Sequence, residues 1–237
     1  MRSVLLSFIE GIYRTDIPSC VWFFWKTMEK IKIELGDKLR KILHIYIFAQ
    51  EAYLYTEYFH NPATKEESEL VTNSPHSSNL STIMHIMFRT TISEISKLYS
   101  RSDHDKFRLE SFIKSLLPSG HFREIEVAID HVEQWQKQLD ENKDIIDNIL
   151  LLRSKLYAHT DNPMTDYKGV EISFKQIKVL LELAADILKK IYAEIFDAEQ
   201  QTDSPTFDRD RFLILKLAAK GEKDRLTEIF NRHKKLE

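Results

Sequence analysis

The chain contains little glycine, proline or cysteine. Only five of its 237 residues are glycine and six are proline, whereas sheets and barrels need these residues for their many tight turns. The shortage argues against a β-sandwich, a β-barrel and a glycine-looped nucleotide fold. Cys20 is the single cysteine, which excludes internal disulfides and multi-cysteine zinc sites and predicts a reducing, cytoplasmic location.

An excess of charge of one sign and long hydrophobic runs are also missing. The sequence has 34 basic and 37 acidic residues, a net charge of −3, so polyanion binding would require a local patch rather than a global field. Every window of about 18 residues contains charged side chains, so we expect no transmembrane helix and no membrane partner. A hydrophobic fraction of 43% nevertheless indicates a folded chain with a substantial core.

Apolar residues recur at helical spacing along most of the chain, which predicts an all-α fold. We expect an antiparallel helical bundle over residues 1–200, with additional N- and C-terminal helices, and a C-terminal helical hairpin over 201–237. The expected helices span residues 19–35, 38–59, 80–99, 106–117, 121–140, 143–158, 174–195, 206–219 and 222–235.

Local signals mark several of these boundaries. Gly36 leaves open whether the first two helices are continuous, and residues 60–79, rich in Ser, Thr, Asn and Pro, predict one long loop. Ser173 and Gln176 match a capping box, and Ser204-Pro205 matches a helix start.

Arg153 has an unusual position in the helix predicted over 143–158. Its neighbours three and four residues away are all apolar or aromatic: Ile149, Leu150, Leu156 and Tyr157. Because an isolated buried charge is very costly, this arginine must be paired, face a cleft or contact a partner chain.

His159 follows Arg153 by six residues, where the helix should end. In an ideal helix the two lie about 120° apart around the axis and about 9 Å apart along it. A tightened last turn, or a second copy of the helix packed across a two-fold axis, would bring such residues together. The ordinary alternative is that both residues cap the negative end of the helix dipole.

The segment Arg153-Ser-Lys-Leu-Tyr-Ala-His159-Thr-Asp161 resembles the signature of the HEPN superfamily, an Arg followed after four to six residues by a His near the end of a late helix. Its local form is similar to the abortive-infection U-type branch. Residues 92–117, which include ISKLYS and FRLESFIKSLL, are also similar to that branch, although less specifically.

The resemblance implies a bundle of four or five helices that forms a homodimer. Many members are metal-independent endoribonucleases whose site forms where two motif helices meet, often in phage defence or toxin–antitoxin systems. RNA is then the expected substrate or ligand, and a cognate antitoxin or nucleotidyltransferase is an implied partner. A related group carries a tyrosine that is modified by such a transferase two places after the His, where this chain has Asp161.

RNA cleavage without a metal needs a base for the 2′-hydroxyl proton, a cation for the phosphorane and an acid for the leaving 5′-oxygen. His159 suits both proton transfers, because an unperturbed imidazole titrates at a pKa of about 6.5. Arg153 suits the phosphate, because its planar fork stays charged and binds two oxygens.

Four further residues are candidate supporting groups, and each has an ordinary structural alternative. Asp161 can orient His159 or pair with Arg153, or simply form a turn. Ser154 and Lys155 can contact phosphate or lie on a solvated face, and Tyr157 can stack a base or pack in the core.

Other functions stay open at this stage. Active members usually have Asn, Asp or His directly after the Arg, and this chain has Ser154. One alternative is therefore an inactive HEPN module that binds RNA, a nucleotide or a partner protein. Another is an adaptor whose motif helix is only a dimer seam. The nine histidines are scattered without metal-ligand spacing, so we expect no metal and no cofactor.

Overall fold

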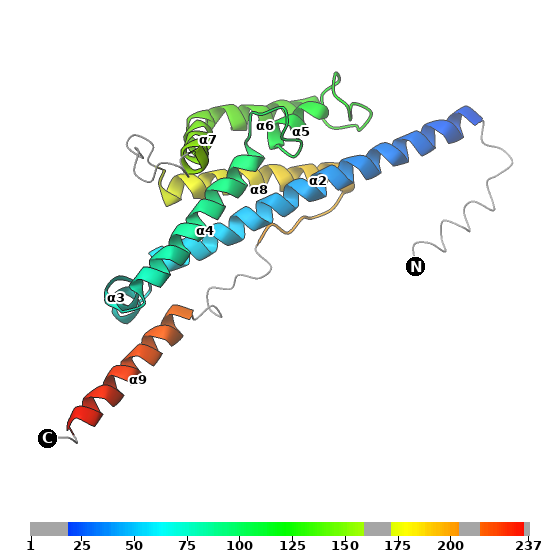
Figure 1. The fold of residues 1–237 in the computed structure, drawn as a ribbon. Helices are drawn as coiled ribbons and strands as arrows, with labels where there is room; N and C mark the ends of the chain where they lie inside the picture. The colour runs from blue at the N-terminus through cyan, green and yellow to red at the C-terminus, as the bar shows by residue number, and fades with distance from the viewer. Residues whose placement is uncertain (1–18, 159–171, 204–213, 235–237) are drawn as a thin grey trace, which may run out of the picture.

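The computed structural model describes residues 19–158, 172–203 and 214–234 (Figure 1). These residues form helices joined by turns and contain no strand, so the predicted all-α bundle is confirmed. The helices are α2 (Ser19–His60), α3 (Lys65–Asn73), α4 (Ser77–Leu98), α5 (Leu109–Ser115), α6 (Ile129–Glu141), α7 (Lys143–Ala158), α8 (Phe174–Phe196) and α9 (Ile214–Lys234).

Helix α2 is the central element of the bundle. It is a single helix of 42 residues, and α4 and α8 run along it (Figure 1). Leu39, Ile42 and Ala49 are fully buried, as expected for a helix that is apolar on nearly every face. Gly36 does not interrupt it, because a glycine inside a helix weakens it only modestly.

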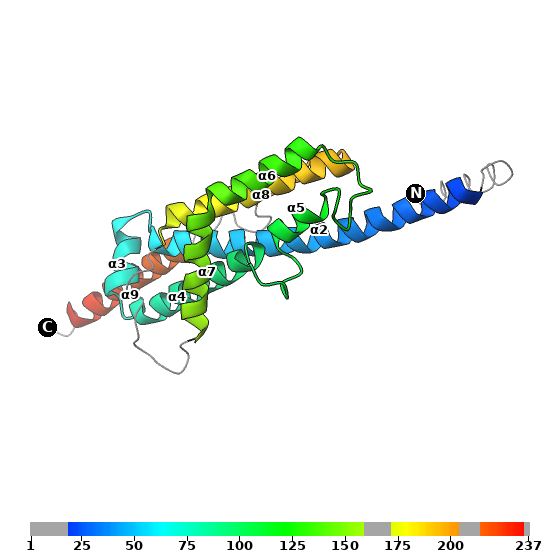
Figure 2. The same cartoon turned by 90° about the horizontal axis from the view of Figure 1, so that it is seen from above.

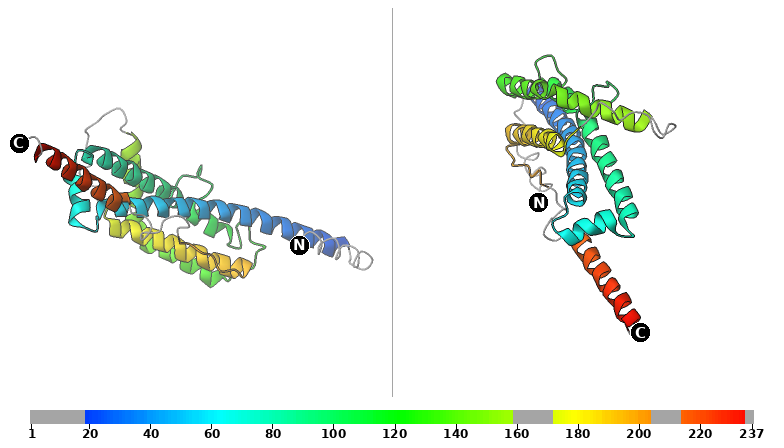
Figure 3. Two further views of the ribbon diagram at one scale, coloured as in Figure 1. Left: turned by 90° about the horizontal axis from the view of Figure 1, so that it is seen from below. Right: turned by 90° about the vertical axis from the view of Figure 1, so that its left-hand side faces the viewer.

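The remaining helices cover this central layer. Helices α6 and α7 lie over α2, α4 and α8 in the end-on view of Figure 3, and α7 crosses α4 and α2 steeply in Figure 2. One large apolar core joins α2, α4, α5, α6, α7 and α8. Its largest fully buried side chains include Trp135, Tyr46 and Phe112.

The predicted long loop over 60–79 is wrong, because this segment contains α3 and the start of α4. A capping box begins α3. The Glu67 backbone N–H donates to the Thr64 hydroxyl at 3.2 Å, and the Glu67 carboxylate accepts from the Thr64 N–H at 3.3 Å. A polar segment can therefore form a helix when its first turn is capped from both sides.

The helix predicted over 121–140 begins only at Ile129. The preceding residues form turns that still bury Phe122 and Ile125, so their apolar spacing resembled a helix. A close backbone approach sets this geometry: a Cβ at Gly120 would lie 2.3 Å from the Ser115 carbonyl oxygen, and the Phe122 N–H donates to that same oxygen.

Several local predictions are confirmed. The helices expected over 80–99, 143–158 and 174–195 correspond to α4, α7 and α8, and the one expected over 106–117 is the shorter α5. The capping box of α8 is present, with the Gln176 N–H donating to the Ser173 hydroxyl at 3.2 Å.

Helix α9 packs against α3 through its first turns (Figure 1). A small second core forms there from Tyr58, Phe59, Leu70 and Leu215, and the Leu215 N–H donates to the Tyr58 hydroxyl at 3.1 Å. Because α9 continues through Gly221, the predicted break between helices 206–219 and 222–235 is wrong. Ser204-Pro205 lies outside the described residues, and the domain boundary at 200–201 stays a prediction.

Within the described ranges, no helix combines the length and the apolar character needed to span a lipid bilayer.

Candidate functional site

Helix α7 positions the candidate arginine. Its apolar face consists of Ile146, Ile149 and Leu152, which are at most 6% exposed and anchor the helix in the main core. The three-residue spacing of these positions places them on one side of the helix, which packs against α4. Arg153 directly follows this anchored stretch, so the position of its backbone is fixed by the core.

Arg153 lies in a cavity of about 490 Å³ between α4, the α4–α5 loop and α7. Ser93, Arg101, Leu150, Arg153 and Ser154 line this cavity, which we call the Arg153 pocket. Arg153 is half-buried there, and Ile149 behind it is fully buried. Arg153 thus lines a cleft, one of the three settings expected for it beside pairing and contact with a partner chain; the side chains of Leu156 and Tyr157 are not described.

A second arginine increases the positive charge of the pocket. Arg101, in the loop after α4, forms an ion pair with Asp147 of α7 at 2.5 Å between Nη2 and Oδ1. Both side chains are partly exposed, 50% and 42%, so this pair is weak and screened by water. Arg153 itself forms no ion pair with any residue in the described part of the chain.

Ser154 and Lys155 have modest roles in this geometry. The Ser154 hydroxyl donates to the Leu151 carbonyl oxygen at 2.7 Å, an ordinary hydrogen bond for a serine inside a helix. Ser154 is one of the residues that line the Arg153 pocket. Lys155 is half-buried and does not line the pocket.

His159 and Asp161 lie outside the described residues, and Tyr157 belongs to α7 without a described side chain. The described part of the site therefore unites Arg153 and Ser154 with two residues that the sequence reasoning did not single out, Ser93 and Arg101. Both of these fall inside residues 92–117, the second segment that resembles the abortive-infection branch. Their position in that segment is the one sequence feature that could have indicated them.

The lining of the Arg153 pocket is suited to an anion, but it contains no carboxylate, histidine or lysine that could act as a general acid or base. The lining includes two arginines and two serines, residue types that commonly bind phosphate. Among the residues that the structure describes, no three His, Cys, Asp or Glu side chains converge as a metal site would require. Proton transfer at this place would have to come from a residue beyond the described lining.

No family model, curated protein or solved structure matches this chain.

Proposed function

We propose that this chain is a HEPN-type, metal-independent endoribonuclease that acts as a homodimer in the cytoplasm, in phage defence or a toxin–antitoxin system. The observation that supports the proposal is the position of Arg153. It is half-buried in an anion-compatible pocket beside Arg101, and a histidine follows six residues later in the sequence.

In the proposed reaction, His159 removes the proton of the RNA 2′-hydroxyl, and O2′ attacks the adjacent phosphorus. Arg153 and Arg101 stabilise the charge of the resulting phosphorane. The P–O5′ bond then breaks, and a protonated histidine donates its proton to the leaving 5′-oxygen. The products are a 2′,3′-cyclic phosphate and a 5′-hydroxyl. In a homodimer, one histidine from each protomer can act as base and acid.

The first experiment measures cleavage of structured and single-stranded RNA in EDTA. The wild type should produce 2′,3′-cyclic phosphate ends, and Arg153→Ala and His159→Ala should reduce the rate at least about a hundredfold, as expected when a transition-state contact or a general acid–base group is lost. Arg123→Ala is the matched control, because Arg123 is exposed and lines neither described pocket. Undiminished cleavage by either site variant would disprove the assignment.

A mixing experiment tests the composite site. Arg153→Ala and His159→Ala protomers are each inactive, but a mixed dimer contains one intact Arg153 and one intact His159 on different chains. Activity should return if the site joins residues of two protomers. If activity does not return although mass spectrometry shows mixed dimers, the reaction needs either Arg153 and His159 of one protomer or the histidines of both protomers.

A second candidate function is a catalytically inactive HEPN module that binds RNA, a nucleotide or a partner protein. Ser154 favours it, because its hydroxyl is engaged with the Leu151 carbonyl oxygen at the place where active members carry a stronger polar group. In that case RNA would bind with salt-dependent affinity and stay intact. Ser154→Asn separates the two functions, since it should create or raise cleavage only in a site that is otherwise complete.

A further inference from the structure

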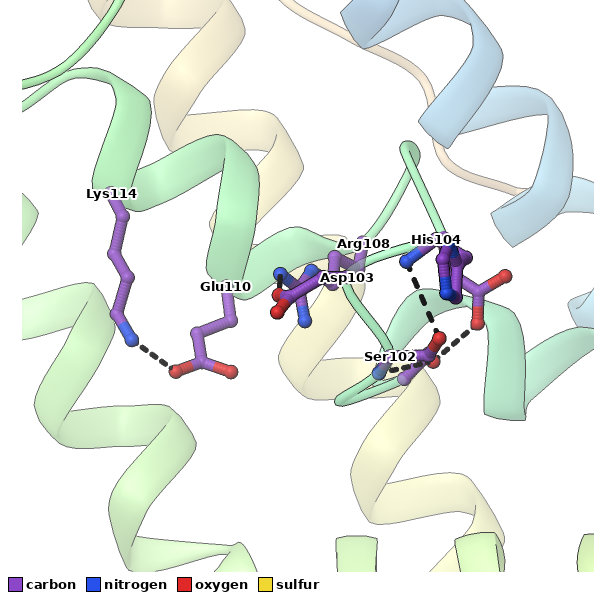
Figure 4. Close-up of polar contacts among 8 residues, drawn as sticks. Ser102, Asp103, His104, Arg108, Glu110 and Lys114 are labelled. Atoms are coloured by element: carbon purple, nitrogen blue, oxygen red, sulfur yellow. Dashed lines mark hydrogen bonds and ion pairs between the residues drawn. The ribbon is translucent and has the colours of Figure 1, made fainter.

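A second cavity lies next to the Arg153 pocket. It has a volume of about 410 Å³ and is bounded by the α4–α5 loop, α5, the end of α6 and the start of α7. Its basic lining residues are Arg101, Arg108, Lys114 and Lys143, and its acidic ones are Asp103, Glu110 and Asp140. Figure 4 shows the α5 side of this cavity, with the Lys114–Glu110 and Arg108–Asp103 pairs next to each other.

The two cavities adjoin at Arg101, which lines both, and we call the two together the groove. One face of α7 is its floor: Lys143 and Ile146 line the second cavity, and Leu150 and Arg153 line the first. These positions are spaced by three, four and three residues, so they share one side of the helix. From Lys143 to Arg153 the groove extends about 15 Å at about 1.5 Å per residue.

Cations along this groove are incompletely neutralised. Lys143 is exposed and, like Arg153, has no ion pair within the described part of the chain. Arg108 is paired only with Asp103, whose side chain is 95% exposed, and such a pair is easily shared with another anion.

Arg108 is mostly buried where it lines the second cavity. Its own side chain is 16% exposed, and its Nε is buried without a hydrogen-bond partner. Burial is the main cause that lowers the pKa of nearby Lys38; Glu34 opposes this shift, and Arg108 adds to it.

The arrangement of the cations favours a chain of phosphates over a single one. A separation of about 15 Å, the length of ten helical residues, is too long for one phosphate and can accommodate several phosphates of one strand. The aromatic side chain of the second cavity, Tyr99, is 5% exposed, and its hydroxyl donates to the Leu180 carbonyl oxygen. It is therefore not available for stacking on a base.

We propose that this groove, from Arg108 and Lys143 through Arg101 to Arg153, binds the phosphodiester backbone of an RNA strand and guides it to Arg153. The choice of RNA rests on the proposed function. Binding occurs through the backbone, so it should be tolerant of sequence.

The test uses a fluorescein-labelled 2′-O-methyl oligoribonucleotide, which lacks the attacking 2′-hydroxyl and reports binding without cleavage. Lys143→Glu should raise its Kd about tenfold and reduce the slope of log K against log salt by about 0.7, the value for one lost phosphate contact on a single strand. Lys189→Glu is the matched control, because Lys189 is exposed on α8 and lines neither cavity. Equal effects of the two variants would overturn the proposal.

A second variant is expected to bind the oligonucleotide more tightly, a result that misfolding cannot produce. Asp147→Asn removes the carboxylate that competes for Arg101, so the oligonucleotide should bind more tightly. Unchanged or weaker binding by this variant, with an unchanged circular dichroism spectrum, would contradict the proposal. Competition by poly-glutamate or by AMP as effective as that by unlabelled oligonucleotide would also overturn it, in favour of an acidic protein or a mononucleotide.

These outcomes are separable from those of the proposed function. If the wild type cleaves RNA in an Arg153-dependent manner while Lys143→Glu leaves KM unchanged, the groove proposal fails and the nuclease proposal stands. If RNA binds in the groove but is never cleaved, the nuclease proposal fails and the groove proposal stands.

Discussion

The main core consists of buried aliphatic and aromatic side chains, whereas the groove along α7 is lined mostly by charged and polar ones. In the core, α2, α4 and α8 bring together fully buried aliphatic side chains such as Ile42, Ile92 and Ile187. In the groove, partly exposed ion pairs such as Arg101–Asp147 lie beside Ile146, which lines the groove and also belongs to that core. We therefore expect the groove charges to change with little loss of stability, because exposed ion pairs contribute little compared with core packing.

The largest expected effect is in the core. Ile92→Ala on α4 removes a side chain with 0% exposure and should reduce the free energy of unfolding by about 2–5 kcal/mol through lost burial and a residual cavity. Urea denaturation followed by circular dichroism measures this value. Ile86→Ala is the matched control, because Ile86 is on the same helix and 53% exposed. Similar losses for both variants would contradict the assignment of the core.

The second-largest expected effect is a loss of folding stability at alkaline pH. Burial raises the pKa of Tyr46 and of Tyr53 to about 12, above the value of about 10 in an unfolded chain. The unfolded state therefore releases these protons first, so stability is full below pH 10 and declines as the pH rises toward 12. The slope approaches about 1.4 kcal/mol per pH unit for each such tyrosine.

The variant Tyr46→Phe checks this dependence. Compared at the same pH values by urea denaturation, it should lose less stability than the wild type between pH 10 and 12. If both proteins lose stability in parallel over that range, Tyr46 is not one of the responsible groups.

Tyr99 is the residue where the two regions meet, because it belongs to the core and also lines the groove. Tyr99→Phe removes the 2.5 Å hydrogen bond from the tyrosine hydroxyl to the Leu180 carbonyl oxygen and should cost about 0.5–1.5 kcal/mol, because this carbonyl keeps its bond within α8. Oligonucleotide affinity should stay within about twofold, since this hydroxyl already has its partner inside the protein. A loss of affinity without a loss of stability would break the distinction between the two regions.

The smallest expected effect is in the groove. Asp103→Ala removes the exposed partner of Arg108 and should change the free energy of unfolding by less than about 0.5 kcal/mol. The same substitution should tighten oligonucleotide binding, because it leaves Arg108 free to contact phosphate. A destabilisation above about 2 kcal/mol would show that the groove pairs support the fold after all.

The parts that the sequence predicted are those with local causes. Helix α7 follows from its apolar spacing, and the start of α8 follows from Ser173 and Gln176 three residues apart. The prediction that Arg153 does not lie on a freely solvated face also had a local basis, because it rested on neighbours one helical turn away. The prediction of a loop over 60–79 was wrong because it rested on polar composition, whereas the Thr64–Glu67 capping box starts a helix there.

The parts that escaped prediction depend on tertiary contact. Arg101 is 52 positions from Arg153 in the sequence and reaches the same pocket only because α7 crosses α4. The turns over 121–128 bury Phe122 through a close approach of Gly120 to Ser115, which no helical periodicity encodes. His159 and Asp161 stay predictions from the motif alone.

The attachment of α9 has a consequence for amide hydrogen exchange. Its first turns are fastened to α3 by the small core around Leu215, whereas Leu226 and Phe230 farther along are 54% and 69% exposed. Amides in the second half of α9 should therefore exchange through local fraying of an unsupported helix, while those in the middle of α2 should exchange only when the whole bundle opens. One polypeptide would thus show both the fastest and the slowest helical exchange within a single labelling experiment.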